Sequence, residues 1–538
     1  MNEKIIKVFS ILLVFVFVVL WARLWELQIF KGKTNRILAD SNRIQRKIIE
    51  APRGLILDRH GEILAKNEPV YEIKDEASSK KVIARDEALI LQAESPDTIV
   101  EIKQKRLYPF RDLFAHLIGY VGEISEKELK EEKLDLKGYG PGSLVGRAGV
   151  ESQYEELLKG REGSELVEVN TVGKVIRHMG QILPKTGKIL TLAIDKNLQE
   201  IAGREMEGKK GAVVALDPRN GEILVFYSSP SYDPNLFLKD SDQAELLKII
   251  HDQNNNPLLN RVIAGSYPPG STFKIVTAVA GLEEGAINAN SLIKDTGIIR
   301  YGNFSFTNWY YTSYGKTEGE VDIVKALARS TDTFFYKLGE MVGIEKLNYW
   351  AQRFNIGQKT GIDLPGEIEG FMATPEWKKQ NRNEDWFLGN TYHISIGQGD
   401  LSLTPLQVAA LTSAVASEGK ICQPRILKIG AENTPYGANC RNIDIKKQTL
   451  ELVKKGMIAA CSSGGTGFPF FDFKPQVACK TGTAETGDGK TTHAWFTVFA
   501  PASEPKIVLT VLVERGGEGS SVAAPIAKEI LKQWFKSQ

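Results

Sequence analysis

The sequence has few of the residues that build metal centres and redox sites. Only four of its 538 residues are cysteine; all lie in the last quarter, and none form a CxxC pair, which argues against a zinc or redox motif. The six histidines show no HExxH or similar ligand spacing. We therefore expect no metal and no cofactor, while one disulfide remains compatible with an oxidising compartment.

An excess of either charge is also lacking. Lysine and arginine number 68 against 66 aspartates and glutamates, which leaves no electrostatic case for a nucleic-acid partner. The chain has no low-complexity run and no evident internal repeat. Its length predicts two or three folded domains.

One long apolar run lies near the N-terminus. Val8 to Ala22 contains no charge, and Lys7 and Arg23 flank it. The run spans about 22 Å as a helix, so neighbouring apolar residues must extend it to cross the roughly 30 Å hydrocarbon core. No A-x-A cleavage pattern follows, so we expect an uncleaved single-pass anchor.

The composition predicts three regions, which are a tail and anchor over 1–30, a mostly β pedestal over 31–188, and a larger domain over 189–538. In the pedestal, the turn at Asp58 to Gly61 lies between two short strand patterns, and Asp75 to Lys105 reads as charged and irregular. Five glycines between Gly138 and Gly149 predict a loop or hinge. The larger region has strand patterns at both ends and helical patterns between them, which predicts a mixed α/β (α+β) domain.

The most informative stretch runs from Tyr267 to Lys274. Two prolines and a glycine predict a turn, Ser271 stands where a helix would begin, and an apolar run continues to Leu282. Lys274 is the only charge in this run, three residues after Ser271 and so on the same helical face. A buried lysine loses part of its preference for the charged form, so Lys274 could take a proton from Ser271. The alternative is that Ser271 caps the helix while Lys274 pairs with a buried carboxylate.

Two further elements follow in order. Ser330-Thr331-Asp332 lies inside an expected amphipathic helix over 321–342, and Lys480-Thr481-Gly482-Thr483 follows a strand-like run. The patterns are weak singly, because S-x-x-K occurs six times and K-T-G three times. Only Ser271 follows a Pro-Pro-Gly turn, and only Lys480 lies in an apolar run, so the ordered trio is informative where each motif alone is not.

With this trio the sequence resembles a class B penicillin-binding protein. The resemblance extends nearly end to end, and Ser330-Thr331-Asp332 followed by Thr-Phe-Phe-Tyr is similar to the elongation type, penicillin-binding protein 2. The other matching segments are Arg53-Gly54, Asp58 to Gly61, Gly146 to Glu151, Asp233-Pro234-Asn235, Asn260-Arg261, Gly397-Gln398-Gly399 and Thr404 to Gln407. The implied fold is a penicillin-binding transpeptidase fold, a mixed sheet flanked by helices.

The resemblance implies a peptidoglycan D,D-transpeptidase that acts on stem peptides ending in D-Ala-D-Ala and is inhibited by β-lactams. Ser271 would be the nucleophile, Lys274 its base and Ser330 a proton relay. Asp332 would hydrogen-bond Lys274 or the substrate amide, and Lys480 would help to lower the pKa of Lys274. Thr481, Gly482 and Thr483 would bind the substrate, and the backbone N–H groups of Ser271 and Thr483 would form the oxyanion hole.

Location and partners are likewise implied. A single-pass protein of the bacterial cytoplasmic (inner) membrane, with its enzymatic domain on the periplasmic or outer side, would work with a SEDS-type glycosyltransferase and other elongation-complex proteins. The chain departs from the family in a short segment between Tyr71 and Arg106. In the family this segment forms the membrane-distal head that contacts partners, so we expect a reduced head. Some relatives bind zinc between the first two elements, but no histidine or cysteine lies between Lys274 and Ser330. The alternatives are a D-alanyl-D-alanine carboxypeptidase or β-lactamase-like hydrolase, and a membrane scaffold without activity.

Overall fold

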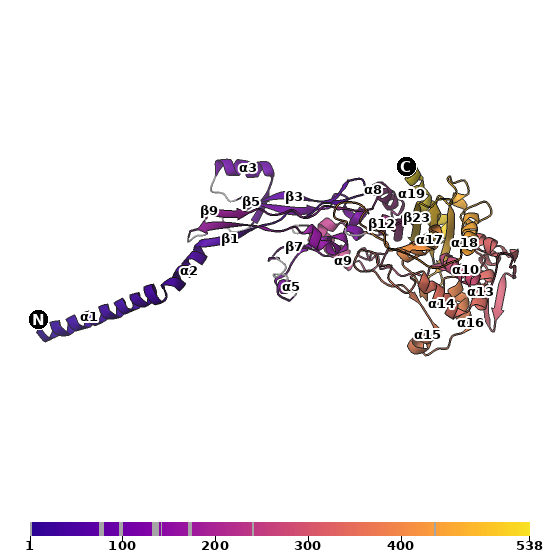
Figure 1. Ribbon diagram of the computed structural model, residues 1–538, viewed down its shortest axis with the longest axis horizontal. Coiled ribbons are helices and arrows are strands. Elements are labelled where there is room, and N and C mark those ends of the chain that lie inside the picture. The colour runs from indigo at the N-terminus through magenta and orange to yellow at the C-terminus, as the bar shows by residue number, and fades with distance from the viewer. Residues whose placement is uncertain are drawn as a thin grey trace. The chain divides into compact units, whose positions relative to one another are not determined.

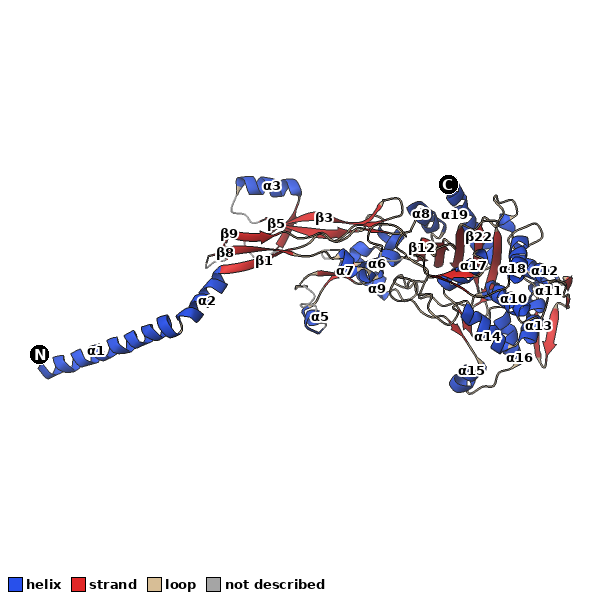
Figure 2. Cartoon of the chain, viewed as in Figure 1, coloured by secondary structure: helices blue, strands red, loops and turns tan. Residues whose placement is uncertain are grey.

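The computed structural model describes residues 3–74, 80–95, 100–131, 139–140, 142–170, 175–238, 241–434 and 437–537 (Figures 1 and 2). The chain forms two compact units, which we describe separately. The first comprises Met1–Arg53, Pro69–Gln104 and Lys159–Gly187, and the second comprises Gly54–Glu68, Lys105–Leu158 and Lys188–Gln538. The region boundaries expected from the sequence, after residues 30 and 188, remain predictions.

The first unit begins with the long helix α1 (Glu3–Trp25), which continues as the π-helix η1 (Glu26–Phe30). This continuous helix is long and apolar enough to cross a membrane, and none of its most apolar window is buried by the protein. It fits the expected single-pass anchor. The other elements that lie wholly or mainly in this unit are α2 (Gly32–Arg43), β1 (Ile44–Ile49), β4 (Lys80–Ile83), α3 (Arg85–Glu94), β5 (Val100–Leu107), β8 (Gly163–Val169) and β9 (Val175–Ile182). Strand β3 (Ile63–Lys74) is divided equally between the two units.

Strands β1, β8 and β9 form an antiparallel sheet with exposed apolar residues on one face. Paired residues of adjacent strands share a face, and Ser164 of β8 pairs with both Ile48 and Ile182. Ile48 and Ile182 are 51% and 66% exposed, whereas Val167 on the opposite face is 3% exposed. The exposed side of this sheet, which we call its open face, therefore presents isoleucines, together with the exposed Arg46, which alternation places on the same face of β1.

The expectation that Asp75 to Lys105 is irregular was wrong for the described residues. The segment contains β4, the helix α3 and most of β5, and β3 pairs with both β4 and β5. The high charge concealed these elements because their side chains are mostly exposed, so no apolar periodicity marks them. Residues 75–79 and 96–99 lie outside the described part.

A buried ion pair organises the first segments of the second unit. The Arg106 Nε atom donates to Glu151 Oε1 over 2.7 Å, and both side chains are 0% exposed. Arg106 also donates to the Gly54 carbonyl at 2.8 Å, and the Tyr108 hydroxyl donates to Glu151. These bonds join three distant segments, and they satisfy charges that would otherwise be costly to bury. The elements here are β2 (Ile56–Leu57), η2 (Arg111–Phe114), α4 (Ala115–Ile118), β6 (Val121–Glu123), α5 (Glu126–Glu131), β7 (Leu144–Gly146), α6 (Gly149–Gln153), α7 (Glu155–Leu158) and β10 (Leu190–Thr191).

A five-stranded antiparallel sheet forms the centre of the second unit, in the order β12-β11-β23-β22-β21 (Figure 2). Its strands are β11 (Gly211–Leu216), β12 (Ile223–Ser229), β21 (Ala478–Glu485), β22 (Thr492–Ala500) and β23 (Ile507–Val513). The hairpin predicted at Asn220-Gly221 is confirmed by the pairing of β11 with β12. All seven residues of β23 are buried, as expected for a strand covered on both faces.

Helices cover both faces of this sheet and create two hydrophobic cores. Alternate residues of β11 separate into them, since Val214 lies in one core and Val213 in the other. Helix α17 (Pro405–Ala416), which is fully buried, packs against β11, β22 and β23 on one face, while α8 (Lys196–Glu205) and α19 (Ala524–Lys536) supply the second core. The α/β (α+β) class predicted from the sequence is confirmed.

The remaining elements connect these layers. They are η4 (Pro234–Phe237), α9 (Gln243–His251), η5 (Gly270–Phe273), α10 (Lys274–Glu283), β13 (Ile293–Asp295), β14 (Ile298–Tyr301), β15 (Phe304–Thr307), α11 (Trp309–Tyr314), β16 (Gly319–Val321), α12 (Ile323–Arg329), α13 (Asp332–Val342), α14 (Ile344–Arg353), β17 (Phe371–Met372), α15 (Pro375–Arg382), α16 (Leu388–Ser395), β18 (Leu401–Ser402), β19 (Lys420–Cys422), β20 (Cys440–Asn442), α18 (Lys447–Ala460), η6 (Phe468–Phe470) and η7 (Gly519–Ala523). The four cysteines form two disulfides, Cys422–Cys440 and Cys461–Cys479, rather than the single one considered from the sequence.

Candidate active site

The turn before Ser271 differs in detail from the expected helix start. Ser271 lies inside the 3-10 helix η5, whose N-cap is Pro269, and the α-helix proper begins at Lys274. Ser271 is therefore not a helix cap. Residues i and i+3 of a 3-10 helix eclipse each other, so Ser271 and Lys274 lie on the same side of the segment, as the sequence predicted.

Strand β21 packs directly against this turn. A Cβ atom on Gly270 would lie 2.8 Å from the Thr483 carbonyl oxygen, and Gly270 has a φ of +53°, so only glycine fits there without strain. The Gly270 N–H donates to the Gly397 carbonyl at 2.9 Å, and the Trp495 indole donates to the Pro268 carbonyl at 2.9 Å. The turn is thus fixed from both sides, with Ser271 beside the strand that carries Lys480.

Ser330 lies at a break in the helix expected over 321–342. Helix α12 ends at Arg329, Ser330 adopts left-handed backbone angles with φ 55° and ψ 40°, and α13 begins at Asp332. A non-glycine residue in this region is strained, and such residues cluster at functional sites. The break places the Ser330 carbonyl and side chain together beside Lys274.

Two buried lysines converge on the Ser330 hydroxyl. Lys274 Nζ donates to Ser330 Oγ at 3.2 Å, to the Ser330 carbonyl at 2.9 Å and to Asp332 Oδ1 at 2.6 Å. Lys480 Nζ donates to the same Ser330 Oγ at 2.9 Å. Both lysines are 0% exposed. Since Ser330 Oγ accepts twice, its own proton remains available to donate.

Burial sets the protonation of the two lysines. It lowers the pKa of Lys274, while the charge of Asp332 and its hydrogen bond oppose that change. For Lys480, burial and then the charge of Lys274 lower the pKa well below its usual range, again against Asp332. Burial is thus the main cause at Lys274, as the sequence predicted, whereas the charge effect expected from Lys480 on Lys274 is found in the opposite direction, from Lys274 on Lys480.

Asp332 is held by a segment that the sequence did not single out. The Trp309 N–H donates to Asp332 Oδ2 at 3.0 Å, and Asn308 Oδ1 accepts from the Asp332 N–H at 3.1 Å. Asn308 Nδ2 in turn donates to Asp295 Oδ2 at 2.9 Å. Thus both the backbone and the side chain of Asp332 are fixed from one loop.

Asp295 anchors that loop through its carboxylate. It accepts hydrogen bonds from Thr333 Oγ1 at 2.6 Å and from the backbone N–H groups of Gly297 and Glu318, in addition to Asn308. Burial raises the pKa of Asp295, but these hydrogen bonds together outweigh it and lower the pKa. Among the described residues, no group of three or more histidines, cysteines, aspartates or glutamates could hold a metal ion.

The other predicted site residues lie along β21. Thr481 is 8% exposed, and its hydroxyl donates to Thr466 Oγ1 at 2.8 Å, while Thr483 is exposed. The Gln398 amide donates to the Thr483 carbonyl at 3.4 Å. The structure therefore brings Lys274, Ser330, Asp332 and Lys480 into one hydrogen-bonded cluster. Ser271 lies in η5, which contacts β21, the strand that carries Thr481 to Thr483.

Sequence reasoning missed Asn308, Trp309 and Thr466. Asparagine, tryptophan and threonine carry no motif at these positions, and their roles depend on contacts with Asp332 and Thr481, which are distant in the sequence. Gly397 and Gln398 contact the Ser271 turn and Thr483. The sequence indicated them only as part of a segment that matches the family.

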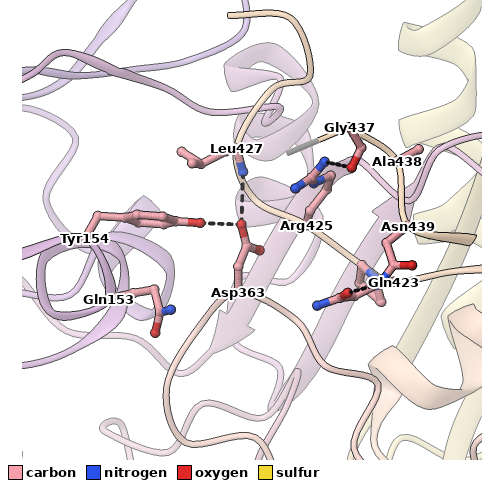
Figure 3. Close-up of a pocket in the computed structure, with 10 residues that line it drawn as sticks. Gln153, Tyr154, Asp363, Gln423, Arg425, Leu427, Gly437, Ala438 and Asn439 are labelled. Carbon is pink, nitrogen blue, oxygen red and sulfur yellow. Dashed lines mark hydrogen bonds between the residues drawn. The ribbon is translucent and has the colours of Figure 1, made fainter. Parts of the chain in front are cut away.

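A separate cavity of about 540 Å³ lies elsewhere in the second unit, lined by Gln153, Tyr154, Asp363, Gln423, Pro424, Arg425, Leu427, Gly437, Ala438 and Asn439. Tyr154 donates to Asp363, which also accepts from the Leu427 N–H, and Gln423 bonds Asn439 (Figure 3). The Arg425 guanidinium also donates to the Gly437 carbonyl at 2.6 Å, so most of the polar side chains drawn bond to other lining residues. The cavity shares no residue with the Ser271 site.

The fold and the site together define a class of protein. It is a serine acyl-transfer enzyme with a mixed α/β domain and a buried lysine pair, and an apolar helix precedes that domain in the sequence. Comparisons with known proteins agree. The model of the penicillin binding protein transpeptidase domain matches residues 211–532, and that of the penicillin-binding protein dimerisation domain matches residues 80–192. This chain belongs to the penicillin-binding protein transpeptidase family.

Three relatives illustrate the similarity. The peptidoglycan D,D-transpeptidase MrdA of Acinetobacter baumannii is 35% identical, over 97% of this chain and 86% of that protein. PBP2 of Helicobacter pylori, solved in a complex with MreC, has a TM-score of 0.80 at 31% identity and covers 91% of this chain and 98% of its own. A chain of a peptidoglycan synthase complex has a TM-score of 0.79 at 28% identity, over 98% and 97%. The predicted resemblance to PBP2 is confirmed.

We predict that Asn308→Ala destabilises the second unit. Asn308 is 0% exposed, and its loss leaves Asp295 and the Asp332 N–H each without one partner. Unsatisfied buried groups cost about 1–3 kcal/mol, so the midpoint of denaturant unfolding of the detergent-solubilised chain should fall. The exposed Asn290→Ala should change the free energy of unfolding by less than about 0.5 kcal/mol. Equal midpoints for the two variants would contradict the role of Asn308.

Proposed function

We propose that this protein is a peptidoglycan D,D-transpeptidase that cross-links stem peptides through an acyl-enzyme on Ser271 during cell-wall elongation. The observation that carries the proposal is the convergence of Lys274 and Lys480 on Ser330 Oγ, with Lys274 three residues after Ser271. A nucleophilic hydroxyl, a buried amine as its base and a second hydroxyl as a proton relay are sufficient for acyl transfer without a metal.

In the first step, Ser271 Oγ attacks the carbonyl between the last two D-alanines. Lys274 accepts the Ser271 proton, which requires the neutral amine. The lowered pKa of Lys274 supports this role. A neutral amine has two protons and one lone pair, so Lys274 can keep two of its three hydrogen bonds and turn the lone pair toward Ser271.

The tetrahedral intermediate then collapses. The C–N bond breaks, the leaving D-alanine amine gains a proton through Ser330, and Lys274 replaces the proton on Ser330. An amine from a second stem peptide attacks the Ser271 ester and loses a proton, the C–O bond breaks, and Ser271 recovers its proton. Ser330 Oγ accepts a hydrogen bond from each lysine, so its own hydroxyl proton is free to be donated, which supports the relay.

Binding of the donor peptide would use β21, including Gly482. Lys480 and the hydroxyls of Thr481 and Thr483 suit a terminal carboxylate, and Gly482 lets the strand pack closely on the Ser271 turn, because a Cβ atom there would lie 3.0 Å from Thr272 Cγ2. The backbone N–H groups of Ser271 and Thr483 would stabilise the oxyanion, an effect worth about 3–4 kcal/mol per donor in serine hydrolases. The tight packing of Gly270 on Thr483 supports this pairing, since it keeps the two segments in contact.

The hydrolytic alternatives differ only in the acceptor. Water in place of the amine would give a carboxypeptidase or, with a β-lactam as donor, a β-lactamase-like reaction. The relative that covers nearly this whole chain is named a D,D-transpeptidase, which favours transfer. Inhibition by penicillins follows from the same chemistry, because a strained β-lactam would acylate Ser271.

The proposed location is the bacterial cytoplasmic (inner) membrane, with α1 as a single-pass anchor and the transpeptidase domain on the periplasmic or outer side. Two independent features support it. Helix α1 has no charge between Lys7 and Arg23, and both disulfides belong to the second unit, which suits an oxidising compartment.

The proposed partners are a SEDS-type glycosyltransferase and other proteins of the elongation complex. A solved relative was in complex with MreC, and another belongs to a peptidoglycan synthase complex. Within the first unit, the open face of the β1-β8-β9 sheet is the surface that fits such a contact. Ile44, Ile48, Leu166 and Ile182 share that face and are 37%, 51%, 44% and 66% exposed.

Fluorescent penicillin should label the detergent-solubilised full chain at Ser271. Ser271→Ala removes the nucleophile, so covalent labelling should disappear on a denaturing gel. The matched control is Ser313→Ala, which alters an exposed serine in another S-x-x-K sequence and should leave labelling unchanged. Labelling that survives in Ser271→Ala would refute the acyl-enzyme, and rapid loss of the wild-type adduct would favour a β-lactamase.

The acylation rate should rise with pH, because Lys274 is a base only when neutral. Its midpoint should lie below the usual lysine value, since burial lowers the pKa of Lys274. Asp332 opposes that change, so Asp332→Asn should move the midpoint to lower pH. Stopped-flow acylation between pH 5 and 10 would measure it, with the exposed Glu345→Gln as a charge-matched control. A midpoint that moves to higher pH would exclude Lys274 as the base.

Charge on the open sheet face should weaken the partner contact. We expect the double variant Ile48→Glu/Ile182→Glu to lose most co-purification with a co-expressed SEDS-type glycosyltransferase, because two carboxylates would have to be desolvated. Gln45→Glu, on the opposite face of β1, is the control. Penicillin labelling should be unaffected by either. Unchanged recovery of the double variant would place the contact elsewhere.

A further inference from the structure

The two disulfides differ in their relation to the candidate site. Cys461 is the C-cap of α18, and Cys479 lies on β21 directly before Lys480. Both are buried, at 4% and 0% exposed. We propose, on the basis of the function above, that the Cys461–Cys479 disulfide is a positioning crosslink, which holds the strand that carries Lys480 against the helices that carry Ser330.

Strand β21 needs such support because it lies at the edge of the sheet. Among the described residues, the strand that pairs with β21 is β22, so the hydrogen bonds of the sheet hold β21 from one side. Edge strands are the most easily displaced part of a sheet. The disulfide adds a covalent bond from β21 to α18, one residue away from the lysine that must reach Ser330 Oγ.

A second contact fixes the same face of the strand. Side chains alternate between the two faces of a strand, so Cys479 and Thr481 lie on one face and Lys480 on the other. Thr481 Oγ1 donates to Thr466 Oγ1 at 2.8 Å. The disulfide and this hydrogen bond therefore pin the strand on either side of Lys480, which sets the direction of the lysine.

Thr466 belongs to the short loop that begins at Cys461. The Thr466 N–H donates to the Ala328 carbonyl at 3.2 Å, and the Arg329 guanidinium donates to the Gly464 carbonyl at 2.7 Å. Ala328 and Arg329 immediately precede Ser330. The loop thus contacts β21 on one side and the end of α12 on the other.

Helices α12 and α18, which flank the loop, pack against each other. A Cβ atom on Gly456 would lie 2.6 Å from the Leu327 Cβ atom, so the two helices are in close contact. At the far end of the loop, a Cβ atom on Gly467 would lie 2.8 Å from Cys479 Sγ and 2.9 Å from Cys461 Sγ. The loop is therefore packed directly onto the disulfide. The 2.9 Å hydrogen bond from Lys480 to Ser330 depends on the loop, the disulfide and the two helices together.

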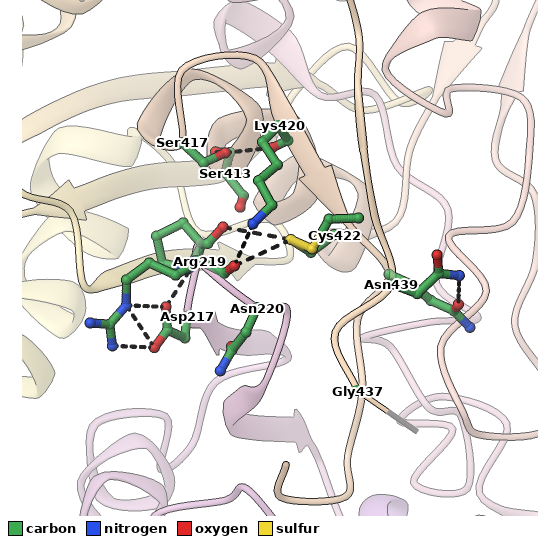
Figure 4. The surroundings of a disulfide bond; sticks show 12 residues. Asp217, Arg219, Asn220, Ser413, Ser417, Lys420, Cys422, Gly437 and Asn439 are labelled. Carbon is green, nitrogen blue, oxygen red and sulfur yellow. Dashed lines mark hydrogen bonds and ion pairs between the residues drawn. A yellow bond between two sulfur atoms is a disulfide. The ribbon is translucent and has the colours of Figure 1, made fainter. Parts of the chain in front are cut away.

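The other disulfide provides a matched control. Cys422–Cys440 has the same sequence separation of 18 residues, so the two crosslinks constrain the unfolded chain equally. Its neighbours include Asp217, Arg219 and Ser417, which are not part of the Ser271 site (Figure 4). It joins β19 to β20, and Lys420 of β19 donates to the Arg219 carbonyl at 3.0 Å.

The experiment compares Cys461→Ala/Cys479→Ala with Cys422→Ala/Cys440→Ala in the full chain. Both should lower the thermal midpoint, because the closed loops are equally long. Only the first should slow acylation by fluorescent penicillin, by roughly ten- to a hundredfold, since a displacement of about 1 Å at a reacting group can cost a hundredfold in rate. Equal acylation rates for the two variants would overturn the proposal.

Thr466 separates positioning from general stability. Thr466→Val removes the hydroxyl that accepts from Thr481 and should slow acylation, whereas Thr466→Ser keeps the hydroxyl and should restore the rate. Valine and serine variants with the same rate would contradict the role of Thr466. Wild-type chain that is not labelled at Ser271 would instead refute the proposed function, so the two failures are distinguishable. Peptide mapping without reductant must find the Cys461–Cys479 link; two free thiols would also overturn the proposal.

Discussion

Two buried lysines donate hydrogen bonds to one serine hydroxyl, that of Ser330. The rest of the site depends on how the protein accommodates two lysines that are so close together and buried. Lys274 and Lys480 are fully buried, and Asp332 is the carboxylate that the structure places against them among the described residues. Two ammonium groups cannot remain charged at low cost in such a place, so proton loss from the pair is favoured. A free amine next to a serine is the consequence, and burial rather than any single neighbour supplies it.

This arrangement requires three segments that are far apart in the sequence to stay within hydrogen-bond distance. The central sheet provides the reference, because its strands are buried on both faces and cannot slip without exposing a core. The Ser271 turn packs on β21 through Gly270, and the break at Ser330 lets one residue present both its carbonyl and its hydroxyl to Lys274. The Asp295–Asn308 chain then fixes Asp332 from the opposite side.

The sequence was informative where chemistry and local structure coincide. The apolar run after Ser271, with its one lysine, predicted a buried pair, and the order of three elements identified the family. It was less informative where the geometry arises from long-range contacts. The helix break at Ser330 has no proline or glycine to mark it, so an uninterrupted apolar pattern predicted one helix. Asn308 and Thr466 were invisible because their partners lie 24 and 15 residues away. The charged segment after Asp75 concealed strands whose side chains are largely exposed.

The site is built from elements that are individually unfavourable. Each of three features is unfavourable by itself: the left-handed backbone of Ser330, the burial of two lysines and the edge position of β21. Relaxation of these features would separate Lys480 from Ser330 Oγ and break the hydrogen-bonded cluster. The fold must therefore restrain the site from outside, and it does so where the sheet is weakest. Cys479 precedes Lys480, and Thr481, which bonds Thr466, follows it, so the restraints flank the residue whose position matters most.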